Sequence, residues 1–324
     1  MKHTILLFAS ALLGFFSLSC EEDFNPKTDF REEQVLTCIV ATKSQAYTAY
    51  LTNLYDVEGT NPMKNPIDPV ISGAQVTMLY NGRTFLFSED TLKSTSGSRY
   101  SSKAIVYHGA GDKIGGHDSL YVIARLANGK VLRGATKTPD DKTFELSYPF
   151  ASGFSTKINQ FLWGTQWQID WLKTDDNLFI PKLYAIYEID SAGIVKLKQQ
   201  ELPMRYVKKG DTRVPVYPLP TRATSILYSY SAIDSAVAAI GKNLSDKTKI
   251  KLLRISFTLV ELDEHLTKYY LSTNGYLDQF SIRIDETVYG NVKNGLGIVA
   301  SYNNNQLDFR VKPEYAQLFG YSFE

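Results

Sequence analysis

The sequence predicts an all-β fold, and three observations lead to that prediction. Short runs rich in β-branched and aromatic residues recur along the chain. Several of them alternate apolar and polar residues, as residues 74–80 do, which predicts strands with one buried face. Gly, Asn and Asp separate the runs. Because the chain has 324 residues, we expect two domains.

The N-terminal half holds a series of short predicted strands. They span residues 34–42, 46–55, 74–80, 83–88, 104–107, 119–126 and 130–136. Asn81-Gly82 and Asn128-Gly129 each lie between two of them and predict tight hairpins, because both central residues of a type I′ turn need positive φ. About seven short strands in a hundred residues are typical of an immunoglobulin-like sandwich, which we expect over residues 34–139.

The second half, residues 140–324, is expected to be a larger β-rich domain. We place the boundary after residue 139 because residues 137–143 have no period and contain a Pro-Asp-Asp turn signal. The strand patterns that follow span residues 156–171, 182–190, 193–202, 251–262, 278–285 and 296–302.

One or two short helices should interrupt these strands. Residues 231–241 are rich in Ala and end on Gly241, a plausible helix C-terminus. Residues 263–274 begin with Asp263-Glu264, and acidic residues are favoured in the first turn of a helix. The prolines in residues 215–220 predict an extended surface segment instead.

Residues 1–19 have the pattern of a secretory signal peptide. A positively charged start is followed by an apolar run, which is too short to span a membrane, and then by small residues. Cys20 at the cleavage point resembles the lipobox of bacterial lipoproteins, although Ser17 stands where Leu or Val is usual. The resemblance implies that Cys20 is acylated and that residues 20–33 form a lipidated tether. The alternative is an ordinary signal peptide followed by an incidental cysteine.

Three acidic residues, Glu21, Glu22 and Asp23, directly follow the cysteine. They resemble the export signal that sends Bacteroidota lipoproteins to the outer face of the outer membrane. The resemblance implies a lipid-anchored protein that is exposed at the cell surface. Alternatively, the acidic run only keeps a flexible tether soluble, as charge runs commonly do.

Charge and cysteine content narrow the class of function. The chain has 35 basic and 34 acidic side chains. Removal of the signal peptide takes away one basic residue and leaves a mature chain that is formally neutral. Its net charge therefore does not favour binding to nucleic acid. Cys38 is the only other cysteine and lies in an apolar strand-like run. We therefore expect a buried, unreactive thiol at Cys38.

All three tryptophans, Trp163, Trp167 and Trp171, fall on the same face of one predicted strand. Such a face can stack against sugar rings or another flat ligand, and this is one hypothesis for a binding site. The alternative is a core-facing strand, because aromatic side chains dominate core burial.

The sequence signals no catalytic residue, metal or cofactor. No HExxH or G-x-S-x-G motif is present. His108 and His117 flank a Gly-rich stretch that has Asp112 and Asp118 nearby. This stretch reads as a loop between strands, with a loop metal site as the alternative.

Four hydroxyl residues lie in Asp-(Ser/Thr)-apolar tripeptides, which resemble the O-glycosylation acceptor pattern of Bacteroidota. They are Thr91, Ser119, Ser191 and Ser235. The alternative is that Asp-Ser pairs simply begin strands or helices, where they are common.

Two stretches together resemble the Bacteroidota lipoproteins of domain-of-unknown-function family 4249. The first comprises residues 71–76, 119–124, 128–129 and 135–139, which are similar to that family's N-terminal sandwich. The second comprises residues 288–299 and is similar to its closing signature, with Val292 and Val299 replacing Ile and Phe. The resemblance implies an outer-membrane lipoprotein, often encoded beside TonB-dependent transporters, and it supplies no catalytic residues.

The second stretch also has a physical interpretation of its own. Asn294-Gly295 can turn the chain with positive φ, and Gly297 allows another backbone to approach closely. A phosphate loop would need a following helix, whereas residues 298–300 continue as a strand pattern. A structural turn is therefore favoured over a ligand loop.

The expected function is that of a non-enzymatic, surface-exposed outer-membrane lipoprotein. We expect it to bind a ligand or partner as an accessory to a TonB-dependent transporter, a link that rests on the resemblance alone. A structural or adhesive component of the cell envelope is the second hypothesis. A glycan-acting hydrolase is the third, and no motif supports it.

Overall fold

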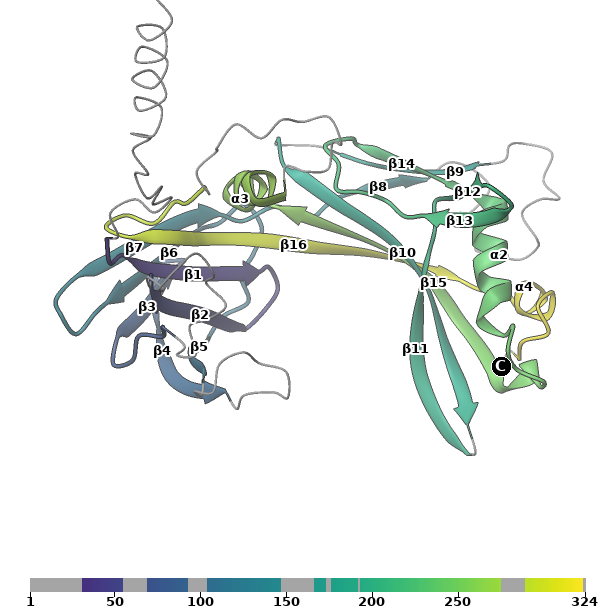
Figure 1. Ribbon diagram of the computed structural model, residues 1–324, viewed down its shortest axis with the longest axis horizontal. Helices are drawn as coiled ribbons and strands as arrows, with labels where there is room; N and C mark the ends of the chain where they lie inside the picture. The colour runs from purple at the N-terminus through teal and green to yellow at the C-terminus, as the bar shows by residue number, and fades with distance from the viewer. Residues whose placement is uncertain are drawn as a thin grey trace, which may run out of the picture.

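The computed structural model describes residues 31–54, 69–92, 104–146, 166–172, 176–191, 193–274 and 289–322. The expected signal peptide, Cys20 and the acidic residues Glu21, Glu22 and Asp23 lie outside these ranges. Over the described ranges the chain is all-β, as expected, with a large mixed sheet and few helices (Figure 1). Within the same ranges, no helix is both long and apolar enough to cross a membrane.

The elements follow one another in a simple order. The strands are β1 (Gln34–Ala41), β2 (Ala46–Asn53), β3 (Gln75–Tyr80), β4 (Arg83–Leu92), β5 (Ala104–Ala110), β6 (Ser119–Arg125), β7 (Val131–Lys137), β8 (Phe144–Leu146), β9 (Gln166–Trp171), β10 (Leu178–Ser191), β11 (Ile194–Leu202), β12 (Arg205–Lys209), β13 (Thr212–Val216), β14 (Ser225–Ser229), β15 (Ile250–Leu262) and β16 (Leu296–Arg310). The helices are α2 (Tyr230–Ile240), α3 (Glu264–Asn274), α4 (Pro313–Gln317) and the 3-10 turn η4 (Lys247–Lys249).

The N-terminal half is a sandwich whose two sheets share one long strand. Residues 83–86 of β4 pair with β3, and residues 87–92 pair with β5. One sheet therefore runs β1-β2-β5-β4 and the other β4-β3-β6-β7. With β1 as the first strand, β1-β2-β5-β4 has the ABED order of an immunoglobulin constant-type domain and β3-β6-β7 has its CFG order, while β4 belongs to both sheets. The two inner faces enclose a core that includes Leu36, Met78, Val122 and Leu132.

Two hairpins of the sandwich test the expected turn type. Asn81 and Gly82 have positive φ of 48° and 71°, which confirms the turn between β3 and β4. Between β6 and β7 only Gly129 has positive φ, and the Leu126 N–H donates to the Lys130 carbonyl. The expectation of a type I′ turn was wrong there, because a three-residue loop ending in a left-handed glycine closes this hairpin.

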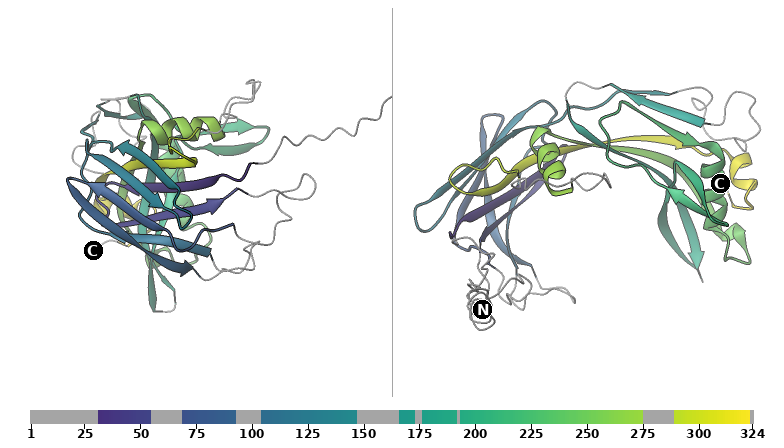
Figure 2. Two further views of the ribbon diagram at one scale, coloured as in Figure 1. Left: turned by 90° about the vertical axis from the view of Figure 1, so that its left-hand side faces the viewer. Right: turned by 45° about the horizontal axis from the view of Figure 1, so that its top comes forward.

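Strand β16 joins the two halves. Residues 296–302 pair in parallel with β1, and residues 302–310 pair antiparallel with β15. Figure 2 shows β16 in yellow running from the sandwich into the C-terminal half. The expected boundary after residue 139 places residues 296–302 in the C-terminal half, whereas in the structure they extend a sandwich sheet. A sequence pattern cannot reveal this pairing, because β1 is the first strand of the chain and β16 the last.

Gly297 allows β16 to lie against β1. Its φ is +109°, and a Cβ atom at this position would lie 2.1 Å from the carbonyl oxygen of Leu36. Any side chain would therefore displace one of the two strands. The expectation that Gly297 permits a close backbone approach is confirmed.

The C-terminal half packs a curved sheet against a second layer. The sheet consists of β11, β10, β15 and β16, and a small sheet, β14-β9-β8, packs with α2 and α4 against it (Figure 1). Trp167, Ile233, Phe257 and Tyr315 lie in the core between these layers. The strands β12 and β13 form a separate hairpin.

The two expected helices are present as α2 and α3. Gly241 ends α2 with φ −94°, so it is not the left-handed residue that the sequence suggested. A Cβ atom there would lie 2.8 Å from the ring of Tyr321, which shows that packing rather than φ requires glycine.

Candidate functional site

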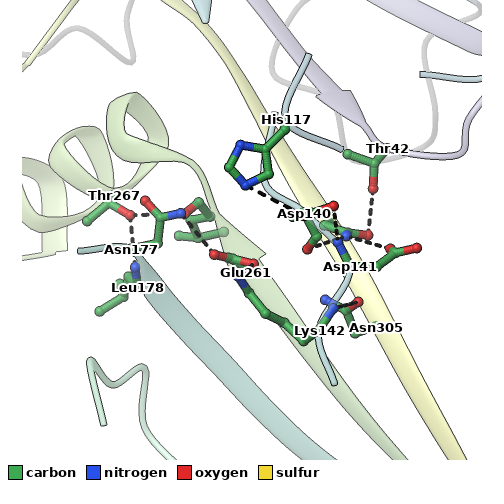
Figure 3. A network of polar contacts seen from close by, with 12 residues as sticks. Thr42, His117, Asp140, Asp141, Lys142, Asn177, Leu178, Glu261, Thr267 and Asn305 are labelled. Atoms are coloured by element: carbon green, nitrogen blue, oxygen red, sulfur yellow. Dashed lines mark hydrogen bonds and ion pairs between the residues drawn. The ribbon is translucent and has the colours of Figure 1, made fainter. Parts of the chain in front are cut away.

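A buried ion pair lies where the two halves meet. Lys142 lies just after the expected boundary, and its Nζ is 3.1 Å from Oε2 of Glu261 on β15, with side chains only 2% and 0% exposed. Glu261 Oε1 accepts a hydrogen bond from Asn177 Nδ2 at 2.9 Å (Figure 3). The backbone N–H of Lys142 donates to Asn305 Oδ1 on β16 at 3.0 Å. This pair therefore fixes the connecting segment to the sheet of the C-terminal half.

Asn303 extends the same network toward the sandwich. Its Oδ1 accepts from Thr42 Oγ1 at 2.6 Å, and its Nδ2 donates to Asp141 Oδ1 at 2.9 Å (Figure 3). Lys43 also contacts Asp141, at 2.6 Å. The hydrogen bond from Asn303 and the bond from Lys43 lower the pKa of Asp141 below its usual value. The β1–β2 turn, the connecting segment and β16 are thus tied together.

Asp263 anchors α3 to both β7 and β16. Its Oδ1 accepts from the Leu266 N–H at 2.7 Å, which caps the helix. Its Oδ2 accepts from the Ser301 hydroxyl at 2.8 Å and from the Thr136 hydroxyl. Burial raises the pKa of Asp263 above its usual value, and these hydrogen bonds oppose that rise. Because donors occupy both oxygens, this carboxyl acts as a structural anchor.

The two histidines that flank the Gly-rich stretch contact carboxylates singly. His108 Nε2 lies 3.9 Å from Asp90, and His117 Nε2 lies 3.5 Å from Asp140. Across the described ranges, no three or more His, Cys, Asp or Glu side chains gather as a metal site would require.

Cys38 lies in the core of the sandwich with no exposed surface. Burial raises the pKa of its thiol to about 12. The thiolate is the reactive form, so this cysteine is inert at neutral pH. The expectation of a buried, unreactive thiol is confirmed.

Two of the three tryptophans belong to the C-terminal core. Trp167 and Trp171 are buried, and the ring of Trp167 packs edge-on against Phe309 with centroids 4.7 Å apart. The stacking hypothesis is wrong for these two side chains, because neither ring has a face open to a ligand. Trp163 lies outside the described residues.

The four acceptor tripeptides differ in accessibility. Thr91, Ser119 and Ser191 are exposed, and their modification stays a prediction. Ser235 is partly buried inside α2, where its hydroxyl donates to the Ser231 carbonyl at 2.6 Å. The neighbouring Asp234 is buried and accepts from the Tyr315 hydroxyl at 2.8 Å. The acceptor interpretation is wrong for Ser235, because the helix hides the tripeptide.

Three hollows adjoin α3. The largest, about 1050 Å³, lies between α3 and the first residues of β16. A second, about 340 Å³, is lined by charged residues that include Lys137, Arg222 and Glu264. The third, about 580 Å³, lies on the outer face of β6 and β7 beside His265 and Lys293. The third combines an apolar floor with basic side chains.

The strand β11 forms an exposed edge of the large sheet. It pairs with β10 on one side, and within the described residues no strand pairs with its other side. Ile194, Val195 and Leu197 are 60%, 61% and 66% exposed. Figures 1 and 2 show the β10–β11 hairpin reaching away from the body of the C-terminal half. We call residues 194–200 the β11 edge.

The junction network was not predicted from the sequence. The expected strand ended at residue 302, and the three residues that follow are Asn, a residue type that is disfavoured in strands. The burial pattern of β16 shows buried Asn303, Asn305 and Phe309 at even spacing, so the period of two in fact continues to the end of the strand. That period was the available signal. No signal in the sequence indicated the contact between Lys142 and Glu261, because this contact depends on how the two halves pack.

No model of a known protein family matches this chain, and a search of curated proteins finds no similar sequence.

Proposed function

We propose that the chain is a non-enzymatic, lipid-anchored protein of the outer membrane, exposed at the cell surface, that binds a TonB-dependent transporter. The signal peptide, Cys20 and the acidic residues after it support the location. The resemblance of residues 288–299 to the lipoprotein family supports the partner. The β11 edge is the observation that carries partner binding.

The β11 edge has the features of a strand that accepts another strand. Its outer side presents backbone N–H and C=O groups, which pair readily with an extended segment of a second chain. Soluble proteins commonly protect such edges, whereas Val195 and Leu197 leave apolar surface exposed here. Both side chains share one face, so a partner that covers this face removes them from water together.

The charge of the edge indicates what kind of strand fits it. Lys196 and Lys198 alternate with the apolar pair and point to the opposite face. An incoming transporter segment with acidic residues at alternate positions would face these lysines. Charge complementarity of this kind directs the register and raises the association rate.

The junction network supports a scaffold that presents this edge in a fixed position. The buried pair of Lys142 and Glu261 and the bonds of Asn303 connect the two halves through side chains. A lipid at the N-terminus would therefore keep the sandwich near the membrane, and the network would hold β11 in a fixed position relative to the sandwich.

The buried acids favour a non-enzymatic role. Asp263 accepts hydrogen bonds from α3, β7 and β16, and Glu261 contacts Lys142 and Asn177. A general acid or base must reach a substrate proton, and these carboxyl groups are instead engaged with the protein itself.

We expect the double variant Val195→Lys/Leu197→Lys to lose copurification with the transporter by about tenfold or more. Lysine at these positions removes the apolar contact and puts charge on the face that the partner must cover, while the fold stays intact because both positions are exposed. The measurement is quantitative mass spectrometry of the tagged protein purified from solubilised outer membranes. Leu86→Lys, a similarly exposed position on β4 of the sandwich, is the matched control and should keep the transporter.

Equal recovery of the transporter with both proteins would contradict a role for the β11 edge. Absence of any transporter, together with binding of the purified protein to host matrix, would favour the adhesive alternative. Release of sugars from a glycan by the purified protein would favour the hydrolase.

A further inference from the structure

Two basic side chains lie directly opposite each other on the outer face of the sandwich. Arg133 on β7 forms a bridge with Lys293, in the segment that precedes β16. The Lys293 N–H donates to the Arg133 carbonyl at 2.7 Å, and the Arg133 N–H donates back at 3.3 Å. Directly opposed residues of an antiparallel pair present their side chains on the same face, and like charges in this position are destabilising.

The backbone around the pair is held firmly, so Arg133 and Lys293 stay opposite each other. Asn291 Nδ2 donates to the Ala135 carbonyl at 2.9 Å and to the Val299 carbonyl at 2.7 Å. Its Oδ1 accepts from the Val299 N–H at 2.8 Å. These bonds fix residues 291–293 against β7 and keep Lys293 beside Arg133.

Among the described residues, no acidic side chain offsets this pair. Within the described ranges, neither Arg133 nor Lys293 has a carboxylate within ion-pair distance. The third basic group nearby is His265 on α3, whose Nδ1 is hydrogen-bonded to the Tyr289 hydroxyl at 2.6 Å. The positive charge of Arg133 and Lys293 is therefore not balanced by any described side chain, and it is available to an anion.

The two cations line a hollow whose remaining walls are mostly apolar. The hollow has a volume of about 580 Å³, and Leu79, Tyr121 and Ile123 contribute to its lining with His265. Small-molecule sites commonly have volumes of about 300–1,000 Å³ and combine apolar walls with a few polar groups. None of the residues that line this hollow is acidic.

We propose that this hollow binds an amphiphilic oxyanion, a carboxylate or phosphate group carried on an apolar body. The oxyanion lies between Arg133 and Lys293 and relieves their repulsion. The apolar body covers Leu79, Tyr121 and Ile123 on the adjoining strands. This inference goes beyond the proposed partner binding and does not depend on it, because the hollow lies on the sandwich and the β11 edge lies in the other half.

The test is isothermal titration calorimetry of the mature lipoprotein in dodecyl maltoside micelles, with three probes. We expect hexyl phosphate to bind with one site per chain. Inorganic phosphate should bind with an affinity lower by about tenfold or more, and hexanol should show no saturable binding. In Arg133→Gln/Lys293→Gln the affinity for hexyl phosphate should fall by about tenfold or more. Arg125→Gln, an exposed basic residue on β6 outside the hollow, should bind hexyl phosphate as the wild type does.

Unchanged affinity in Arg133→Gln/Lys293→Gln, or no binding of hexyl phosphate by the wild type, would overturn the proposal. Equal affinity for inorganic phosphate and hexyl phosphate would overturn the amphiphile and leave a simple anion site. Thermal denaturation checks the fold: the double variant should unfold at the same temperature as the wild type or higher, since a like-charge contact is removed. Copurification of the transporter by this variant should be unaffected, which separates this test from that of the β11 edge.

Discussion

Replacing Glu261 with glutamine is expected to lower the free energy of unfolding by about 3–5 kcal/mol. The substitution keeps the shape and the acceptor for Asn177 but removes the negative charge that faces Lys142. The buried lysine then loses the carboxylate that balances its charge, which costs several kcal/mol because its hydration is not replaced. Urea denaturation followed by tryptophan fluorescence measures the change, since Trp167 and Trp171 report on the C-terminal core.

Two controls separate burial from charge. Glu264→Gln removes a carboxylate that pairs with Lys268 at 2.5 Å on the exposed face of α3, and its cost should be far smaller than that of Glu261→Gln, because water screens an exposed pair. The double variant Lys142→Met/Glu261→Gln removes both buried charges and keeps the acceptor for Asn177, so it should recover most of the stability that Glu261→Gln loses. A loss below about 1 kcal/mol for Glu261→Gln would show that the pair is not desolvated as described.

Trp167→Ala is expected to destabilise the protein by about 3–5 kcal/mol through the cavity that it leaves. The indole is fully buried between Phe309 on β16 and Tyr228 on β14, with ring centroids 4.7 Å and 6.3 Å away. Phe309 and Tyr228 belong to the two layers of the C-terminal half. Removing the indole ring therefore removes a contact between these layers. The midpoint of thermal unfolding is the appropriate measurement.

Leu172→Ala provides the matched control for this substitution. Leu172 directly follows β9 but is exposed, so its truncation should change the stability by less than about 0.5 kcal/mol. A Trp167→Ala protein that unfolds like the wild type would contradict the core position. Loss of glycan binding by such a stable variant would restore the stacking hypothesis.

Local patterns were enough to predict most of the strands and both longer helices. The alternation in residues 74–80 predicted β3, and the Ala-rich stretch that ends on Gly241 predicted α2. These features depend on neighbours within a few residues, which the sequence displays directly. The limits of β16 were missed because Asn303 and Asn305 belong in a strand only when the connecting segment is there to bind their amides.

The candidate sites were harder to predict for the same physical reason. The alternation around Trp167 is that of a half-buried strand, and it does not reveal whether a second layer or a ligand covers the aromatic face. Residues 193–202 were expected to be a strand, but their exposure on both faces depends on which elements cover them. Arg133 and Lys293 lie far apart in the chain, and only the pairing between their segments makes them neighbours.

The most direct test of partner binding is photo-crosslinking in intact cells from position 197. A photoreactive amino acid at this position lies on the exposed face of the β11 edge, and one at position 86 on β4 serves as the control. We expect irradiation to join the protein to an outer-membrane TonB-dependent transporter from position 197 and not from position 86. Crosslinks from position 86 alone, or crosslinks from position 197 only to periplasmic proteins, would contradict the proposal.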